Sequence, residues 1–258
     1  MIAAGRSKRP GASWPHLEPA TQEELDSCPF DAGREDRTPR ETLTLGEPWR
    51  VRVVPNLFPA FERQEVVVHA PEHVRSLAEL DDDQLGLVAE AWRRRREAEP
   101  AGYLHAIVNE GRAAGGSLAH SHSQLVWLPG PPPALTAERG EPDRDHVVVE
   151  RNGLVATCPR AGRVPYELLI EPATPEPDVW KSDLLPAALQ LLADLLRRLH
   201  EVCEGPVPVN AWLHAGTRWH LEVFPRLTVL AGIELGAGVY VNTLAPEEAA
   251  RQLRETAS

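Results

Sequence analysis

Short runs in which apolar and polar residues alternate are separated by Gly, Pro and Asp, which is the pattern of half-buried strands. Two longer segments, 81–97 and 183–203, instead repeat their apolar residues at helical spacing. We therefore predict an α+β fold with a mainly antiparallel sheet and flanking helices. The predicted strands span 49–54, 65–69, 103–109, 124–128, 146–150, 154–157, 168–170, 209–214 and 219–224.

The order of these elements occurs twice, because each predicted helix is followed by a strand, a loop and a second strand that carries histidine. This order predicts two copies of one unit that share a sheet rather than two unrelated domains. Near the chain's end, 232–238 is predicted to be turn-rich and 246–255 to be a short helix. The predicted divisions are a first repeat (1–130, with an irregular arm at 1–48), a connector (131–145) and a second repeat (146–258).

Composition narrows the class of protein without defining its activity. The 258 residues are 42% hydrophobic and carry a formal net charge of −11, so we expect a globular protein that binds neither nucleic acid nor an anionic membrane. No apolar run is long enough to span a membrane or to form a signal peptide, so we expect a cytoplasmic protein. The three cysteines are too dispersed to form a disulfide framework.

The segment 115–124, with the sequence GGSLAHSHSQ, carries the clearest chemistry. In an extended chain His120, His122 and Gln124 would share one side, where they could line an active site. The small residues before them allow close approach of a ligand, and loop N–H groups suit phosphate oxygens. From these residues alone, a metal-binding or core-lining histidine pair remains an equal alternative.

Short motifs along almost the whole chain share one order with a known family: 6–10, 28–30, 53–59, 71–73, 109–124, 220–226 and 232–234. Together they resemble the galactose-1-phosphate uridylyltransferase family of the histidine-triad superfamily. The resemblance implies two fused histidine-triad-like repeats and a homodimer. It also implies transfer of a nucleoside monophosphate between a nucleotide sugar and a sugar 1-phosphate through a covalent nucleotidyl-histidine.

The resemblance assigns a role to each matching residue. His122 would be the nucleophile, and its second ring nitrogen should then donate to a fixed acceptor such as a backbone carbonyl. Gln124 and Ser117 would stabilise the phosphoryl charge. Related hydrolases carry histidine at the position of Gln124, and glutamine cannot act on water as an acid or base, which favours transfer over hydrolysis. The implied nucleotide-binding residues are Asn56, Phe58, Asn109, Arg6 and Arg9, and the implied sugar-binding residue is Glu234.

The resemblance also implies a structural zinc site at Cys28, Asp31, His73 and His120, in which Asp31 replaces the family's second cysteine. Zinc accepts such a mixed set of ligands, and binding it would clamp the arm to the sheet. The alternative is a degenerate site without metal. At the positions of a second metal site found in some members, a carboxylate replaces one histidine, so we expect no metal there. Those positions are Glu138, His214, His220 and Glu222.

The chain departs from the family pattern around the sugar. Ile233 stands where an aromatic residue is usual, Thr228 where a lysine can contact the sugar phosphate, and Tyr240 where a glutamine can contact the sugar. The strand that usually precedes the Arg6 segment is also missing, so we expect a missed upstream start or a truncated sheet edge. The pattern therefore specifies the nucleotidylation step better than it specifies the sugar.

The sequence thus predicts transfer of UMP from a UDP-sugar to a hexose 1-phosphate, in galactose metabolism, by a ping-pong reaction through His122. One alternative is a phosphorylase or hydrolase of another nucleotide or nucleotide sugar, such as an ADP-sugar. A second alternative is a non-catalytic nucleotide-binding protein. The altered zinc and sugar positions favour this last alternative, and the intact nucleophile segment disfavours it.

Overall fold

The alternating runs form one antiparallel sheet in the computed structural model of the protein, which describes residues 1–5, 13–136 and 144–256. Within these residues ten strands follow the order β1-β2-β3-β5-β4-β9-β10-β8-β7-β6. The strands are β1 (Leu43–Leu45), β2 (Val51–Pro55), β3 (Gln64–Val68), β4 (Tyr103–Glu110), β5 (His122–Leu128), β6 (Val147–Arg151), β7 (Leu154–Thr157), β8 (Leu168–Pro172), β9 (Val209–His214) and β10 (His220–Pro225).

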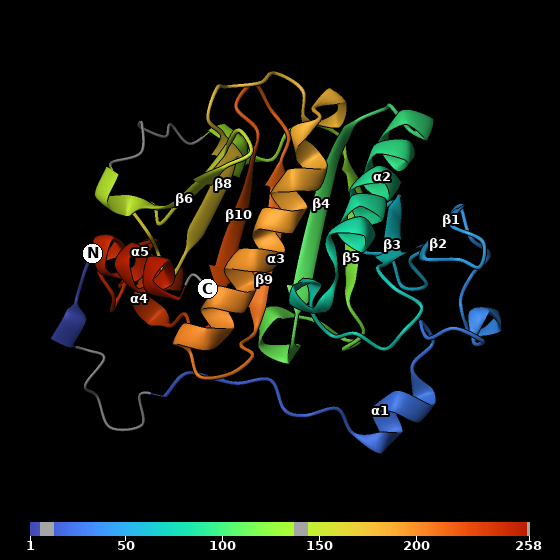
Figure 1. Ribbon diagram of the computed structural model, residues 1–258, viewed down its shortest axis with the longest axis horizontal. Coiled ribbons are helices and arrows are strands. Elements are labelled where there is room, and N and C mark those ends of the chain that lie inside the picture. Colours follow the sequence, from blue (N-terminus) through green and yellow to red (C-terminus); the bar gives the residue numbers. More distant parts are fainter. Residues whose placement is uncertain (6–12, 137–143, 257–258) are drawn as a thin grey trace.

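Helices α2 and α3 lie side by side across one face of this sheet (Figure 1). Asp81 caps α2 by accepting from the backbone N–H of Gln84, and the long apolar stripe of α3 is fully buried. None of the helices in the described part of the chain is long and apolar enough to cross a membrane. The helices are α1 (Gln22–Ser27), α2 (Asp82–Ala98), α3 (Leu184–Val202), α4 (Gly232–Ala237) and α5 (Pro246–Glu255).

The two halves of the sheet have corresponding strand orders when each is counted outwards from the central pair, β4 and β9. On one side β4, β5, β3, β2 and β1 follow each other, and on the other side β9, β10, β8, β7 and β6 occupy the matching places. The prediction that both halves share one sheet is confirmed. We propose that the halves are two copies of one unit, divided as the sequence indicates, because α2 and α3 also occupy matching places in the chain order.

The two faces of the sheet differ in character. Side chains of alternate residues point to opposite faces of a strand. Ser123 faces the helices, since its Oγ accepts a hydrogen bond from Trp92 Nε1 of α2 at 2.8 Å. His122 and Gln124 therefore point to the opposite face, which we call the open face. The same alternation places Asn109 of β4 and Asn210 of β9 on the open face, because their strand neighbours Val108, Ala211 and Val209 lie in the helix-covered core.

Residues 13–42, which we call the arm, are held on the open face and at the edge of the sheet. Cys28 and Phe30 pack with three open-face valines of β2 and β3. The guanidinium of Arg52, which is 1% exposed, donates to Thr38 Oγ1 at 2.6 Å and forms ion pairs with Glu35 and Glu41. These contacts position the arm over the end of β5 that carries His122.

Most predicted elements are present. The predicted strand 49–54 begins two residues later, at Val51, the predicted strand 168–170 ends two residues later, at Pro172, and three further segments differ. The predicted strand 124–128 begins two residues earlier, because His122 pairs with Val68 of β3. The segment predicted to be turn-rich at 232–238 is instead helix α4, in which the Glu234 carboxylate caps the first turn by accepting from Ala231 N. Residues 1–48, predicted to be irregular, contain helix α1 and strand β1.

Candidate active site

The imidazole of His122 is oriented by the backbone. Its Nδ1 lies 2.7 Å from the carbonyl oxygen of His120, which can only accept, so Nδ1 carries the proton and Nε2 carries the lone pair. The hydrogen bond that the sequence led us to expect is therefore present. It leaves Nε2 in the state that a nucleophile requires.

Burial keeps this ring neutral. His122 is only 7% exposed, and burial lowers its pKa below the ordinary value of 6.5, although the hydrogen bond to His120 opposes the shift. The ring of Phe30, on the arm, meets the His122 ring edge to face with centroids 5.5 Å apart. The arm thus excludes water from one side of the imidazole and restricts its orientation.

Amide side chains line the open face beside His122. Gln124 Oε1 accepts a hydrogen bond from Gln64 Nε2 of β3, which leaves the Gln124 NH2 group as the donor end. Asn109 lies on β4 next to this strand, and its Oδ1 accepts from Asn210 Nδ2 at 2.7 Å. His122, Gln124 and Asn109 therefore form one cluster, in which the His122 ring supplies a lone pair and the two amide side chains supply N–H donors.

The loop between β4 and β5 adjoins the end of β5 that carries His122. It contains the short 3₁₀ helix η4 (Arg112–Ala114), followed by Gly115 in the left-handed region with φ of 84°. A Cβ atom on Gly116 would lie 2.8 Å from the carbonyl oxygen of Asn109, so only glycine fits there without displacing the loop. Ser117 follows directly, five residues before His122 at the start of β5.

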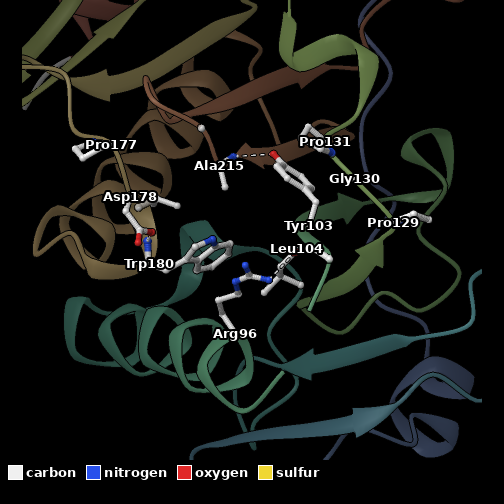
Figure 2. A pocket seen from close by; sticks show the side chains of 13 residues that line it. Arg96, Tyr103, Leu104, Pro129, Gly130, Pro131, Pro177, Asp178, Trp180 and Ala215 are labelled. Atoms are coloured by element: carbon white, nitrogen blue, oxygen red, sulfur yellow. Dashed lines mark hydrogen bonds between the residues drawn. The ribbon is translucent and has the colours of Figure 1, made fainter. Parts of the chain in front are cut away.

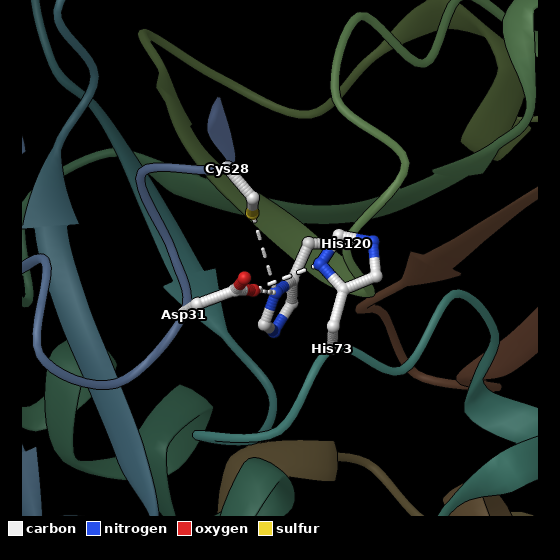
Figure 3. A group of neighbouring side chains, drawn as sticks. All are labelled: Cys28, Asp31, His73 and His120. Carbon is white, nitrogen blue, oxygen red and sulfur yellow. Dashed lines mark hydrogen bonds and ion pairs between the residues drawn. The ribbon is translucent and has the colours of Figure 1, made fainter. Parts of the chain in front are cut away.

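Cys28, Asp31, His73 and His120 converge as the sequence predicted, with one potential ligand atom from each residue within 4.8 Å of the others (Figure 3). Asp31 Oδ1 lies 2.8 Å from Nδ1 of His73 and 2.9 Å from Nδ1 of His120. Burial disfavours ionisation of Asp31, but hydrogen bonds from His73, Cys28 and His120 outweigh it and lower the pKa of the carboxyl group. Burial raises the pKa of the Cys28 thiol to about 11.

The surroundings of this group fit a bound cation. The two histidines present Nδ1 to the centre, while Nε2 of His120 lies 2.9 Å from the Ala70 carbonyl and Nε2 of His73 lies 3.0 Å from a Glu24 carboxylate oxygen. Metal-bound histidines commonly donate their second N–H to such an oxygen. The donor set of one sulfur, one oxygen and two nitrogens suits zinc.

A second group of potential ligands lies on the open face of the other half of the sheet. His214, His220 and Glu222 bring ligand atoms within 4.8 Å of one another. His214 Nδ1 already lies 2.9 Å from His220 Nε2, and the Arg163 guanidinium is hydrogen-bonded to the Glu222 carboxylate. A cation would have to compete with both interactions. Glu138, the fourth predicted member, lies outside the described residues.

The remaining predicted residues do not all join the His122 cluster. Asn56 and Phe58 lie on the β2–β3 loop, where Asn56 Oδ1 accepts from Phe58 N at 2.9 Å and the Phe58 ring is 85% exposed. Glu234 lies in α4, which follows β10 in the chain (Figure 1). Arg6 and Arg9 lie outside the described residues.

A cavity of about 500 Å³ lies at the far end of the sheet, on the side of the helices (Figure 2). Arg96, Tyr103 and Trp180 line it, and the Tyr103 hydroxyl accepts from Ala215 N at 2.8 Å. Tyr103 pairs with Leu128, six residues along β5 from His122, or roughly 20 Å. The cavity is therefore separate from the His122 cluster, and none of the predicted site residues within the described ranges lines it.

Sequence reasoning missed four residues that contact the cluster or support it. Phe30 and Gln64 touch His122 and Gln124, and Asn210 touches Asn109. His69 is fully buried behind β5, where its two ring nitrogens lie 2.9 Å and 3.0 Å from the hydroxyls of Ser121 and Ser123. For these residues the sequence offered two signals: a polar residue at the end of each apolar strand, and the aromatic residue of the Cys-Pro-Phe motif.

The chain is similar to proteins of one family. Residues 59–129 match the family model of the Galactose-1-phosphate uridyl transferase N-terminal domain. ADP-glucose phosphorylase from Arabidopsis thaliana is 26% identical, over 99% of this chain and 89% of that protein. Galactose-1-phosphate uridylyltransferase from Thermotoga maritima is 23% identical, over 74% of this chain and 73% of the relative. A solved structure of a galt-like protein from Arabidopsis thaliana superimposes with a TM-score of 0.82, at 27% identity, over 90% of this chain and 93% of the other.

These likenesses and the fold define a class: the chain is an enzyme with a nucleotidyltransferase fold. It resembles the galactose-1-phosphate uridylyltransferase family, whose N-terminal domain model matches residues 59–129. The resemblance to this family that the sequence motifs indicate is confirmed. The two similar proteins named as enzymes differ in activity, since one is a phosphorylase and the other a uridylyltransferase. The similarity therefore leaves the base and the acceptor to be argued from the site.

Proposed function

We propose that this protein cleaves a nucleotide sugar by covalent transfer of its nucleoside monophosphate to His122. The observation that carries this proposal is the orientation of His122, whose Nδ1 donates to a backbone carbonyl while burial keeps the ring neutral. Nε2 is then an unprotonated nucleophile that faces amide donors rather than a second acid or base. A binding protein without catalysis would not require this arrangement.

The reaction divides into two displacements at the α-phosphorus. In the first, His122 Nε2 forms a bond to phosphorus while the bond to the sugar phosphate oxygen breaks, so sugar 1-phosphate leaves. In the second, an oxygen of the acceptor attacks the phosphorus and the bond to Nε2 breaks. The NH2 groups of Gln124 and Asn109, the Ser117 hydroxyl and the loop amides stabilise the oxygens in both steps.

We place ADP-glucose first among the nucleotide sugars and inorganic phosphate first among the acceptors. The similarity to ADP-glucose phosphorylase covers nearly the whole chain, whereas the similarity to the Thermotoga maritima uridylyltransferase covers three quarters. The three departures at Thr228, Ile233 and Tyr240 also remove side chains that the sequence resemblance associates with a hexose 1-phosphate. Phosphate would not need these contacts. UMP transfer from a UDP-sugar to a hexose 1-phosphate is the second candidate, supported by the match to the uridyl transferase family model.

We further propose that the nucleotide lies along β5. His122 pairs with Val68 at one end of β3, and Gln64, next to the β2–β3 loop, pairs with Val126. Four residues of extended chain, roughly 13 Å, thus separate the phosphate end from the loop that carries Asn56 and Phe58. With its phosphate at His122, the nucleotide would direct its base toward this loop, where the exposed Phe58 ring offers a stacking surface.

The proposed role of zinc is structural. Cys28, Asp31, His73 and His120 would hold the ion, which would fix the arm and so keep Phe30 against His122. Binding would release the Cys28 proton, because the thiolate is the ligand. We propose no metal at the second group, since Arg163 already neutralises Glu222.

A homodimer would supply the sugar-binding residue. Glu234 belongs to α4 in the second half of the chain, whereas His122 belongs to β5 in the first half. We propose that Glu234 of a second copy binds the sugar hydroxyls, so that each active site contains residues of both chains.

A partial exchange reaction tests the proposed function. Labelled glucose 1-phosphate should exchange into unlabelled ADP-glucose in the absence of phosphate. Without an acceptor, this exchange requires a covalent intermediate that the labelled glucose 1-phosphate attacks to form ADP-glucose again. His122→Gly should abolish exchange, and the control His105→Gly, on the same face of neighbouring β4, should retain it. If wild-type enzyme consumes ADP-glucose and phosphate but shows no exchange, the double-displacement mechanism is wrong. Exchange into UDP-glucose instead would support the second candidate.

A further inference from the structure

Asn210 meets Asn109 at the line where the two halves of the sheet join. Strands β4 and β9 pair across this line, with Asn109 and Asn210 directly opposite each other. Both side chains are on the open face and partly buried. The second half of the chain therefore contributes a residue to the edge of the active site in the first half.

The contacts of Asn210 fix the orientation of both amides. Asn210 Nδ2 lies 2.7 Å from the backbone oxygen of Ala114, which can only accept, so this atom must be the NH2 nitrogen. The same nitrogen lies 2.7 Å from the Asn109 side chain, so the Asn109 atom that faces it must be the carbonyl oxygen. Asn109 is thereby required to turn its own NH2 group away from Asn210.

This orientation has a consequence for an anionic ligand. Asn109 is one residue beyond Val108, which pairs with Ser123, so Asn109 lies beside His122 on the same face. An NH2 group there can donate to phosphoryl oxygens at His122, whereas a carbonyl oxygen would repel them. The second hydrogen bond of Asn210 also holds η4, directly before the glycines of the loop.

We propose that Asn210 is a positioning residue for nucleotidyl transfer, acting through Asn109. It presents the Asn109 NH2 group, rather than the carbonyl oxygen, to the phosphoryl group that moves to and from His122. This inference rests on the proposed function and adds to it a residue of the second half that touches no substrate.

Asn210→Asp is the sharpest variant. A carboxylate at this position has the same shape but cannot donate, so Asn109 must rotate its amide to donate to it and then presents its oxygen to the phosphoryl group. We expect the rate at which ADP-glucose labels His122 to fall about 10- to 100-fold, the effect of losing a hydrogen bond to a charged group. Asn109→Asp, which keeps the acceptor for Asn210 but lacks the NH2 group, should cause a similar loss.

A double-mutant cycle separates positioning from a merely structural role. In an Asn109→Ala background, Asn210→Asp should cause a clearly smaller loss of labelling rate than in the wild type, since the amide through which it acts is gone and only the lost bond to Ala114 and the added charge remain. An equal loss in both backgrounds would show that Asn210 acts independently of Asn109 and would overturn the proposal. Thermal melting establishes that each variant is folded, and Asn210→Ala takes the place of Asn210→Asp in the cycle if the latter is unfolded.

Failure of the proposed function is distinguishable from failure of this inference. If wild-type enzyme labels and Asn210→Asp labels equally fast, only the positioning role is wrong. If wild-type enzyme does not label, covalent transfer is wrong, and the same cycle is then measured on equilibrium binding of ADP-glucose, where coupling supports the positioning role and its absence overturns it. No binding of ADP-glucose to the wild type would overturn both.

Discussion

At the scale of single residues, His122 owes its chemistry to its surroundings. Burial lowers its pKa below 6.5, so at any given pH a smaller fraction of this ring is protonated than of an exposed histidine. The labelling rate at pH 6.5 should therefore exceed half of its value at pH 8 and should fall at lower pH, where protonation removes the lone pair. Rapid-quench labelling across this range measures it. A rate already halved at pH 6.5 would contradict the burial argument.

Gln124 determines the fate of the intermediate. Its amide can donate to a phosphoryl oxygen but cannot activate water, and Gln64 holds it in place. Gln124→His should raise the ratio of hydrolysis to transfer at saturating phosphate by at least about tenfold, since general acid–base catalysis contributes typically 10²–10⁴. The measurement is nucleoside monophosphate against nucleoside diphosphate formed. An unchanged ratio would show that another group excludes water.

The sequence predicted the residues of this cluster better than their contacts. The spacing of His120, His122 and Gln124 indicated one shared side because the period of a strand is two. The contact of Asn210 with Asn109 could not be predicted, because it joins residues 101 positions apart through a strand pairing that the sequence does not specify. Phe30 was missed because its partner ring, that of His122, lies far along the chain on β5.

At the scale of elements, the loop before β5 depends on one glycine. A Cβ on Gly116 would meet the Asn109 carbonyl at 2.8 Å, whereas Gly115 has open space around it. Gly116→Ala should cost about 1–3 kcal/mol of unfolding free energy and reduce labelling at least tenfold, because the loop must move. Gly115→Asn is the matched control, since Asn tolerates the left-handed region. Equal losses from the two substitutions would contradict the steric argument.

The arm should depend on the proposed zinc site. Asp31→Ala removes one ligand and the hydrogen bonds to both histidines, so metal content should fall and hydrogen exchange of residues 24–34 should accelerate. Arg52→Met is the control, because it releases the arm's other anchor and leaves the four ligands intact. Elemental analysis and exchange mass spectrometry measure both effects. Unchanged exchange after metal loss would show that the arm needs no metal.

Strands and helices were predictable where a period repeats over several residues, as in α3 and β9. Prediction failed where helix capping or strand pairing determines the structure. Helix α4 was missed because glycines flank it, although Gly238 in fact ends it in the left-handed region and Glu234 caps its start. The first two residues of β5 were missed because serine and histidine carry little strand signal, while pairing with β3 extends them.

At the scale of the whole molecule, the proposed chemistry lies in the first half of the chain and the proposed sugar contact in the second half. His122→Gly and Glu234→Ala should each inactivate a homodimer, and mixing the two should restore activity through hybrid dimers that contain one intact site. The ratio of mixed to unmixed activity measures this. A monomer in sedimentation, or no restoration after subunit exchange is demonstrated, would contradict the shared site.

The covalent intermediate is the claim on which the other proposals depend. Intact-mass spectrometry of the protein, mixed with ADP-glucose in the absence of phosphate and quenched within the first turnover, tests it most directly. We predict an added nucleoside monophosphate on His122 that is labile in acid and disappears when phosphate is added. Turnover of ADP-glucose without any adduct, or an adduct that persists in His122→Gly, would contradict the account.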